Sequence, residues 1–113
     1  MEVGVGEVVL CEFYFSDLKK SKNRPVLVLK DNLPHNDFIA MPISSKVSKL
    51  YPDEMVINGE NFIDGTLPVS SKIMTRKTFV VSKESIVKKY GTLDNGTYSL
   101  VYEKFCKYFD CVK

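Results

Sequence analysis

The feature that most constrains the fold of this chain is a series of short apolar segments separated by turn-forming residues. Each segment is rich in β-branched and aromatic residues, which favour strands, and Pro, Gly, Asn, Asp or Ser lie between the segments. The first strand is predicted at residues 6–15, and the polar residues 16–23 predict a loop. A turn is predicted at 31–36. Further strands are predicted at residues 24–30, 37–44, 53–58, 65–70 and 71–81. Short strands that follow one another in this way favour a small, strongly bent sheet or barrel.

The residue pattern changes after the last of these strands. Residues 82–91 begin with Ser82, a good helix N-cap, and end with Gly91, which suits a helix C-terminus, so a short helix is predicted there. Residues 94–112 carry apolar side chains at spacings of three and four behind Asp94, which predicts an amphipathic helix. The predicted fold class is therefore mainly β with short helices (α+β).

Length and charge limit the possible functions. The chain has 113 residues, so residues 1–113 are expected to form a single domain. No apolar run reaches the ~18 residues of a membrane span and no leader pattern is visible, so we expect a cytoplasmic protein without membrane contact. Residues 16–50 carry a charge of +4, residues 51–70 carry −4 and residues 71–93 carry +5. This polarity indicates a surface that binds a polyanion, or else lysines that only solvate exposed loops.

The three cysteines are Cys11, Cys106 and Cys111, an odd number without zinc-ligand spacing. We expect them to be reduced thiols, in keeping with a cytoplasmic protein. A Cys106–Cys111 bridge is the alternative. It is disfavoured because a separation of five residues along one helix points the two thiols apart.

Residues for the common catalytic strategies are scarce. His35 is the only histidine and lies in the predicted turn, so a two-histidine acid–base pair is excluded within one chain. The sequence contains neither a glycine-rich phosphate loop nor a cluster with metal-ligand spacing. We therefore expect neither a metal site nor a cofactor.

What remains is an arginine and a few hydroxyl groups. Arg24 stands where the polar residues 16–23 meet a predicted strand, and its planar guanidinium offers donors that match two phosphate oxygens. Ser44 and Ser45 end the third predicted strand and would add hydroxyl donors if the second and third strands are neighbours. The alternative for Arg24 is an ordinary surface salt bridge with Asp17 or Asp37.

Three segments together resemble the MazF/PemK family, the ribonuclease toxins of bacterial type II toxin–antitoxin pairs. The first is GEVVLCEFYFSDLKKSKNRPVLVL (6–29), with Gly-acid, an apolar strand, an aromatic residue, a polar loop and Arg-Pro before a Val/Leu strand. The second is DFIAMPISSKV (37–47), similar to the family's strand ending in Pro-Ile-(Thr/Ser)-Ser. The third is KESIVKKYGTL (83–93), which resembles the family segment Ile-hydrophobic-Lys-Lys-Ile-Gly. These segments are distributed from residue 6 to residue 93 and follow the family's order.

The resemblance implies an SH3-like barrel of the CcdB/PemK/MazF type with a C-terminal helix, usually a homodimer. It implies metal-independent cleavage of single-stranded RNA, commonly messenger RNA, and a cognate antitoxin protein as partner. By position, the family's catalytic arginine falls on Arg24 and its catalytic Thr/Ser on Ser44, with Ser45 as the adjacent alternative. The residues expected to bind RNA are Lys19, Lys20, Lys22, Ser45, Lys46, Phe15 and Arg76.

Without a metal or paired histidines, the natural nucleophile is the 2′-hydroxyl of the RNA itself. Its attack on the adjacent phosphorus would leave a 2′,3′-cyclic phosphate and a 5′-hydroxyl. Arg24 and Ser44 would then stabilise the additional charge of the five-coordinate phosphorus. For Arg76 a purely structural role is the alternative to RNA binding.

Two other functional classes are alternatives. CcdB, a relative in fold, poisons DNA gyrase through a C-terminal Trp-Gly-Ile tail, whereas this chain has no tryptophan and ends in FDCVK. A catalytically silent barrel that only binds RNA or a protein partner is the other alternative. Arg24 together with Ser44 favours the nuclease over both.

Overall fold

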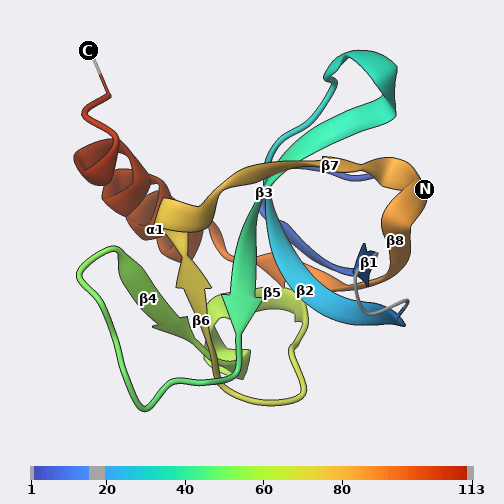
Figure 1. Ribbon diagram of the computed structural model, residues 1–113. Helices are drawn as coiled ribbons and strands as arrows, with labels where there is room; N and C mark the ends of the chain where they lie inside the picture. The colour runs from blue at the N-terminus through green and yellow to red at the C-terminus, as the bar shows by residue number, and fades with distance from the viewer. Residues whose placement is uncertain (1, 16–19, 112–113) are drawn as a thin grey trace.

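The computed structural model describes residues 2–15 and 20–111, which form a curved sheet with a helix packed at one side (Figure 1). The strands of this part of the chain are β1 (Glu7–Phe15), β2 (Lys20–Lys30), β3 (Asp37–Ser44), β4 (Glu54–Ile57), β5 (Phe62–Gly65), β6 (Ser71–Met74), β7 (Phe79–Ser82) and β8 (Ile86–Leu93). The helix α1 spans Asn95–Tyr108, and 3₁₀ turns lie at Pro34–Asn36, Gly59–Asn61, Thr75–Lys77 and Lys83–Ser85. Among the described residues, no helix combines the length and the apolar character needed to cross a membrane.

The strands form one antiparallel sheet in the order β4-β6-β3-β2-β1-β8-β5, and β7 also pairs with β3. β1, β2 and β3 are neighbours in sequence and in space, as their short connections predict. The β1–β8 and β2–β3 ladders contain register shifts, which are typical of bulges that bend a sheet. The sheet therefore curls enough to bury side chains inside its curve.

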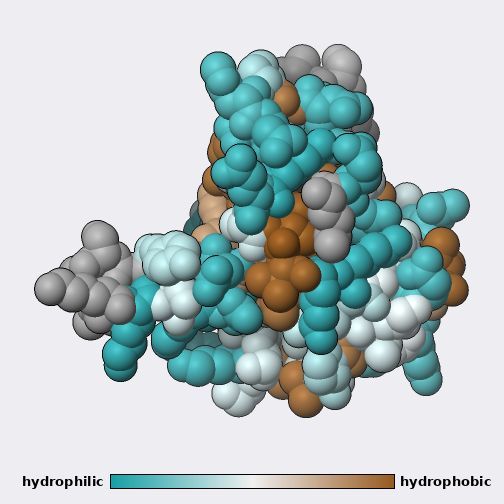
Figure 2. Space-filling view, turned by 90° about the vertical axis from the view of Figure 1, so that its right-hand side faces the viewer, coloured by the Kyte–Doolittle hydropathy of each residue, from teal (hydrophilic) through white to brown (hydrophobic). Residues whose placement is uncertain are grey.

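Two apolar clusters stabilise the sheet, one on each side of β2 and β3. Leu27 and Met41 are cross-strand partners and belong to the first cluster, which also contains Val101 of α1. Val28 and Phe38 belong to the second cluster. All five side chains are fully buried, and each contributes about 2 kcal/mol through its removal from water. On the face shown in Figure 2, hydrophilic residues cover most of the surface, and hydrophobic residues gather in a central patch and in smaller patches at the edges.

The helix predicted at residues 82–91 is wrong. Ser82 does accept a hydrogen bond from the Glu84 N–H, but the turn that it caps is a single 3₁₀ turn, and strand β8 follows it. β8 pairs with β1 on one side and with β5 on the other. These long-range ladders, together with the β-branched Ile86 and Val87, outweigh the local helix signals.

Other element boundaries differ in smaller ways from those predicted. The expected loop at 16–23 is partly strand, because β2 begins at Lys20, and residues 16–19 lie outside the described residues. The strand predicted at 65–70 is wrong beyond Gly65, where β5 ends. The long strand predicted at 71–81 is interrupted by the 3₁₀ turn at Thr75–Lys77, so it forms β6 and β7 instead.

The C-terminal helix is confirmed but is shorter than predicted. Asp94 is its N-cap, because the Asp94 carboxylate accepts a hydrogen bond of 2.6 Å from the Thr97 N–H. The helix ends at Tyr108, and Asp110 adopts a left-handed backbone conformation with φ of 53°. The chain therefore turns back before it reaches Cys111.

This turn brings Cys111 to the end of the helix. The Cys111 N–H donates a hydrogen bond of 2.9 Å to the Cys106 carbonyl, the pattern of a Schellman C-cap. A hydrogen bond to the Cys106 thiol raises the pKa of the Cys111 thiol above its ordinary value. All three cysteines are free, as predicted, but the prediction that Cys106 and Cys111 point apart is wrong because they do not share one helix.

Candidate functional site

Arg24 and Ser44 lie side by side at one end of the β2–β3 ladder. The ladder ends at this side with the pair formed by Val26 and Pro42. Arg24 lies two residues before Val26, and Ser44 lies two residues after Pro42, so the same register brings them opposite each other. Strand pairing therefore brings together two residues that are twenty positions apart in the sequence.

Both residues line a cavity of about 290 Å³ at this end of the sheet. One part of its wall is polar and comes from β2 and from the end of β3, and another part is apolar and comes from residues 67–69. The lining residues are Asn23, Arg24, Pro25, Ile43, Ser44, Ser45, Lys46, Leu67, Pro68, Val69, Ser71 and Tyr90. The cavity thus offers a guanidinium, hydroxyl groups and an ammonium next to an apolar surface.

The Ser44 hydroxyl is positioned by the backbone that follows it. Its oxygen accepts a hydrogen bond of 3.1 Å from the Lys46 N–H, which is a local turn closed by a serine side chain. This contact uses the oxygen as an acceptor, so the hydroxyl proton is left to donate to a ligand. Ser45 also lines the cavity but is more exposed than the partly buried Ser44.

Arg24 is exposed, and Pro25 follows it in β2. Among the residues that the structure describes, Arg24 makes no ion pair, so the alternative partner Asp37 is not bonded to it. Asp17, the other alternative partner, lies outside the described residues. The guanidinium therefore keeps donors that can bind an anion in the cavity.

The lysines predicted to bind RNA lie at different distances from this cavity. Lys46 lines it, whereas Lys20 and Lys22 lie on the exposed first half of β2 and do not. Because alternate residues of a strand share a face, Lys20 and Lys22 extend along β2 on the same face as Arg24. Lys19 lies outside the described residues, and so does the side chain of Phe15 at the end of β1.

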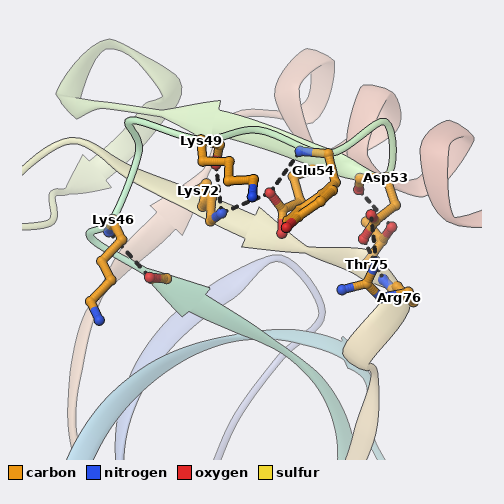
Figure 3. Close-up of polar contacts among 9 residues, drawn as sticks. Lys46, Lys49, Asp53, Glu54, Lys72, Thr75 and Arg76 are labelled. Atoms are coloured by element: carbon orange, nitrogen blue, oxygen red, sulfur yellow. Dashed lines mark hydrogen bonds and ion pairs between the residues drawn. The ribbon is translucent and has the colours of Figure 1, made fainter.

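Arg76 does not line the cavity and belongs to a different set of contacts. Its guanidinium lies 3.8 Å from the Asp53 carboxylate and 5.5 Å from the centre of the Tyr51 ring. The Asp53 carboxylate also accepts a hydrogen bond of 2.9 Å from the Arg76 N–H. Figure 3 shows Lys46 and Arg76 at opposite sides of this region. The structure therefore does not bring Arg76 together with Arg24 and Ser44.

Between these two positions lies a buried ion pair. Lys72 of β6 donates hydrogen bonds of 2.7 Å to Glu54 and of 2.8 Å to the Lys49 carbonyl (Figure 3). The Tyr51 N–H donates a further hydrogen bond to Glu54. Burial alone would raise the pKa of the Glu54 carboxyl, but these hydrogen bonds outweigh it and hold the pKa below its ordinary value.

This ion pair holds in place the loop that forms part of the cavity wall. Lys72 pairs with Ser44 across the β3–β6 ladder, while its ammonium holds the loop at Lys49 and at Glu54. Both ends of the segment between β3 and β4 are thereby tied to β6. The segment begins with Ser45 and Lys46, so the ion pair stabilises one side of the cavity.

The sequence analysis missed several lining residues, Tyr90 above all. Tyr90 was assigned to a helix, whereas it lies in β8. The β-branched and aromatic residues of 86–92 were a strand signal that could have identified this position. Residues 67–69 were assigned to a strand, and no sequence pattern indicated that their loop would close the cavity.

A protein holds a metal ion with several ligating side chains grouped around it. Within residues 2–15 and 20–111, no three or more His, Cys, Asp or Glu side chains are grouped so that they could hold a metal ion. The polar groups at the cavity are hydrogen-bond donors and cations, the groups that bind phosphate.

Solved structures with the same fold extend over nearly the whole chain. A chain of the MazE–MazF crystal structure from Deinococcus radiodurans matches with a TM-score of 0.79 and 18% identity, covering 97% of this chain and 98% of that chain. An endoribonuclease in complex with its cognate antitoxin from a mycobacterial species matches with a TM-score of 0.76 and 11% identity, covering 99% of each chain. The Mycobacterium tuberculosis toxin MazF-mt6 matches with a TM-score of 0.67 and 20% identity, covering 93% and 99%. The predicted fold class is thus confirmed.

No curated protein matches the sequence. The profile of the family described as "PemK-like, MazF-like toxin of type II toxin-antitoxin system" matches residues 5–109. Since that match spans nearly the whole chain, the chain belongs to the PemK-like, MazF-like toxin family of type II toxin–antitoxin systems.

Proposed function

We propose that the chain is an endoribonuclease toxin that cleaves single-stranded messenger RNA without a metal ion. The observation that supports this most directly is the cavity that Arg24 and Ser44 line together. The similar structures named as endoribonucleases add support. We further propose that residues 1–113 form a single toxin domain.

The proposed reaction is a transesterification within the RNA. The 2′-oxygen forms a bond to the adjacent phosphorus and gives up its proton to a base, while the bond from phosphorus to the 5′-oxygen breaks. The leaving 5′-oxygen takes up a proton. The products are a 2′,3′-cyclic phosphate on one fragment and a 5′-hydroxyl on the other.

Arg24 and Ser44 would act as donors to the non-bridging phosphate oxygens. These oxygens gain charge when phosphorus becomes five-coordinate, so donors aimed at them bind the transition state more tightly than the substrate. A guanidinium is a poor acid or base because it keeps its proton in proteins, so the role of Arg24 is electrostatic. Ser44 has its oxygen occupied by the Lys46 N–H and its proton free to donate.

The basic side chains around the cavity would hold the RNA strand. Lys46 and Ser45 lie at the cavity itself, and Lys20 and Lys22 extend the positive charge along β2. Lys19 and Phe15 remain proposed RNA contacts from the sequence alone. Arg76 is left out of this set because it lies outside the cavity and contacts Asp53 and Tyr51 instead.

A cognate antitoxin is the second proposed partner, and a homodimer is the proposed assembly. The support for the antitoxin is the family together with the similar chains that were solved with MazE or with a cognate antitoxin. Size-exclusion chromatography with light scattering tests the dimer. If the reading frame immediately upstream encodes a short acidic protein, co-expression with it tests the antitoxin, and a stable complex is the expected result.

The proposed reaction is tested with purified protein and labelled single-stranded RNA in buffer containing EDTA. Fragments that end in a 2′,3′-cyclic phosphate are the expected product. RNA that stays intact while the protein inhibits gyrase would favour the CcdB-like alternative. RNA that binds but stays intact would favour a silent barrel.

The two serines provide a matched pair of variants. Ser44→Ala should lower the cleavage rate ~10²-fold, the usual cost of removing one donor to a transition-state oxyanion. Ser45→Ala should change it only a few-fold, since Ser45 is the more exposed of the two. The reverse order would assign the catalytic hydroxyl to Ser45.

A further inference from the structure

Tyr90 is a lining residue of the cavity that the proposed reaction does not use. It is partly buried, and it packs against the apolar cluster that contains Ile43 and Leu67. Ile43 and Leu67 line the same cavity. The ring of Tyr90 therefore belongs to the apolar part of the wall, next to the polar part that contains Arg24.

A bulge in the β1–β8 ladder sets the position of Tyr90. Val8 pairs with Gly91 and Val9 pairs with Lys89, so Tyr90 is the extra residue between two successive pairs. An extra residue of this kind turns its side chain away from the regular alternation of the strand, and such bulges are common beside active sites. Tyr90 is thus aimed by the ladder and not by a flexible loop.

The backbone of Tyr90 is held from the other side as well. Its carbonyl accepts a hydrogen bond of 3.2 Å from the Thr66 N–H, at the point where β5 leads into residues 67–69. β5 and β8 approach each other closely there, because Gly65 and Gly91 pair without side chains between them. The backbone of Tyr90 and the start of the 67–69 loop are consequently held next to each other.

The charge around the ring also points to a nucleic-acid component. The Lys88 ammonium lies 4.9 Å from the centre of the Tyr90 ring, so positive charge accompanies this aromatic side chain. Among the described residues, the Tyr90 hydroxyl forms no hydrogen bond, so it can still donate to a ligand or accept from one. An aromatic ring, a free hydroxyl and nearby cations are the features with which proteins bind unstacked bases.

From these contacts we infer that Tyr90 is the specificity-determining residue of the cavity and holds the nucleobase next to the phosphate bound by Arg24 and Ser44. This inference rests on the proposed function. The cavity of about 290 Å³ places Arg24 and Ser44 next to an apolar part of the wall, so a phosphate at the polar part would have its base beside Tyr90.

The test measures binding without cleavage. Four single-stranded octanucleotides, one for each base, are made with 2′-O-methyl riboses, which removes the attacking hydroxyl. Fluorescence anisotropy then gives the affinity of each for the wild type and for Tyr90→Ile, Tyr90→Phe and Tyr108→Ile. Tyr108 is an exposed tyrosine of α1 outside the cavity and provides the matched control.

The wild type should prefer at least one base over the others. Tyr90→Ile should lose this preference and about 5- to 100-fold of the affinity, the usual worth of one base stacked on an aromatic ring. Tyr90→Phe should keep most of the affinity because it keeps the ring, and Tyr108→Ile should match the wild type. On irradiation, an octanucleotide that contains 5-iodouridine should form a covalent crosslink to Tyr90.

Three results would overturn the inference. They are equal affinities for Tyr90→Ile and wild type, a crosslink located elsewhere, and no measurable binding of any octanucleotide by the wild type. Failure of the proposed function looks different, because the wild type would then bind these octanucleotides through Tyr90 and yet leave ordinary RNA intact. Thermal unfolding followed by circular dichroism verifies that each variant is folded.

Discussion

The two arginines of the chain have opposite surroundings. The Arg76 guanidinium contacts both the buried Asp53 carboxylate and the ring of Tyr51, so an anion and an aromatic ring of the same chain already interact with it. Arg24 lines an open cavity with Ser44 and is not ion-paired to any residue that the structure describes. An arginine bound by a carboxylate of its own chain stabilises a loop, whereas one with free donors is ready to bind a phosphate.

The same contrast extends to the residues around each arginine. Asp53 and Glu54 are buried and bonded, and Glu54 has Lys72 as a direct partner. Around Arg24 the cavity is lined by the Ser44 and Ser45 hydroxyls and by Lys46, and no carboxylate of residues 2–15 or 20–111 lines it. One region is thus a set of satisfied contacts that holds the fold, and the other is a set of unused donors. The following predictions test this contrast.

The largest expected effect belongs to Arg24→Ala. Cleavage should fall ~10²–10³-fold in kcat/KM, equivalent to about 3–4 kcal/mol of transition-state stabilisation. The free energy of unfolding should stay within ~0.5 kcal/mol of the wild type, because Arg24 is exposed. RNA cleavage and urea unfolding on the same preparation measure both. Cleavage at the wild-type rate would remove the proposed role of Arg24.

A large effect on stability is expected from Glu54→Gln. This change leaves the Lys72 ammonium buried without its carboxylate, and such a loss costs about 3 kcal/mol. Urea unfolding gives the value. The double variant Glu54→Leu with Lys72→Met is the control and should be more stable than Glu54→Gln, since no unpaired charge remains. A double variant less stable than the single one would show that the pair is needed for more than charge balance.

A smaller effect is expected from acid. The pKa of Glu54 in the folded state lies below its value in the unfolded chain, so its contribution is complete above the unfolded pKa of ~4.3. That contribution is lost as the pH falls through the folded pKa. Lys83 lowers the pKa of Asp31 in the same direction. The free energy of unfolding should therefore decline below this pH in the wild type and decline less steeply in Glu54→Gln. Parallel pH profiles for the two proteins would contradict the assignment.

The smallest effect is expected from Arg76→Ala. The ion pair with Asp53 is long and partly exposed, so its loss together with the Tyr51 contact should cost about 1 kcal/mol. Cleavage should remain within a few-fold of the wild type. A loss of cleavage as large as that of Arg24→Ala would instead indicate that both arginines bind RNA.

Local signals were sufficient for much of the fold. β1 and β3 were predictable from β-branched and aromatic runs that end at turn residues, and Asp94 was predictable as a helix cap. β8 had conflicting signals, because Ser82 and Gly91 are good helix-end residues while Ile86, Val87 and Tyr90 favour a strand. The long-range ladders with β1 and β5 decide for the strand. The residue pattern of a single segment does not indicate which distant segment it will pair with.

The site divides in the same way. Arg24 begins one predicted strand and Ser44 ends the next, and antiparallel pairing of adjacent strands brings these two ends together. Tyr90 and residues 67–69 reach the cavity through a bulge and through a close contact of two backbones. Neither feature has a sequence pattern of its own, so this part of the cavity required the structure.

The contact between Gly65 and Gly91 has a practical consequence for redesign. A Cβ on Gly65 would overlap the Tyr90 carbonyl oxygen, and one on Gly91 would overlap that of Asp64. Neither position tolerates a side chain unless the two strands move apart. A library designed to alter the proposed RNA specificity should therefore randomise residues 67–69 and keep both glycines. Every variant then retains the same backbone contact between β5 and β8.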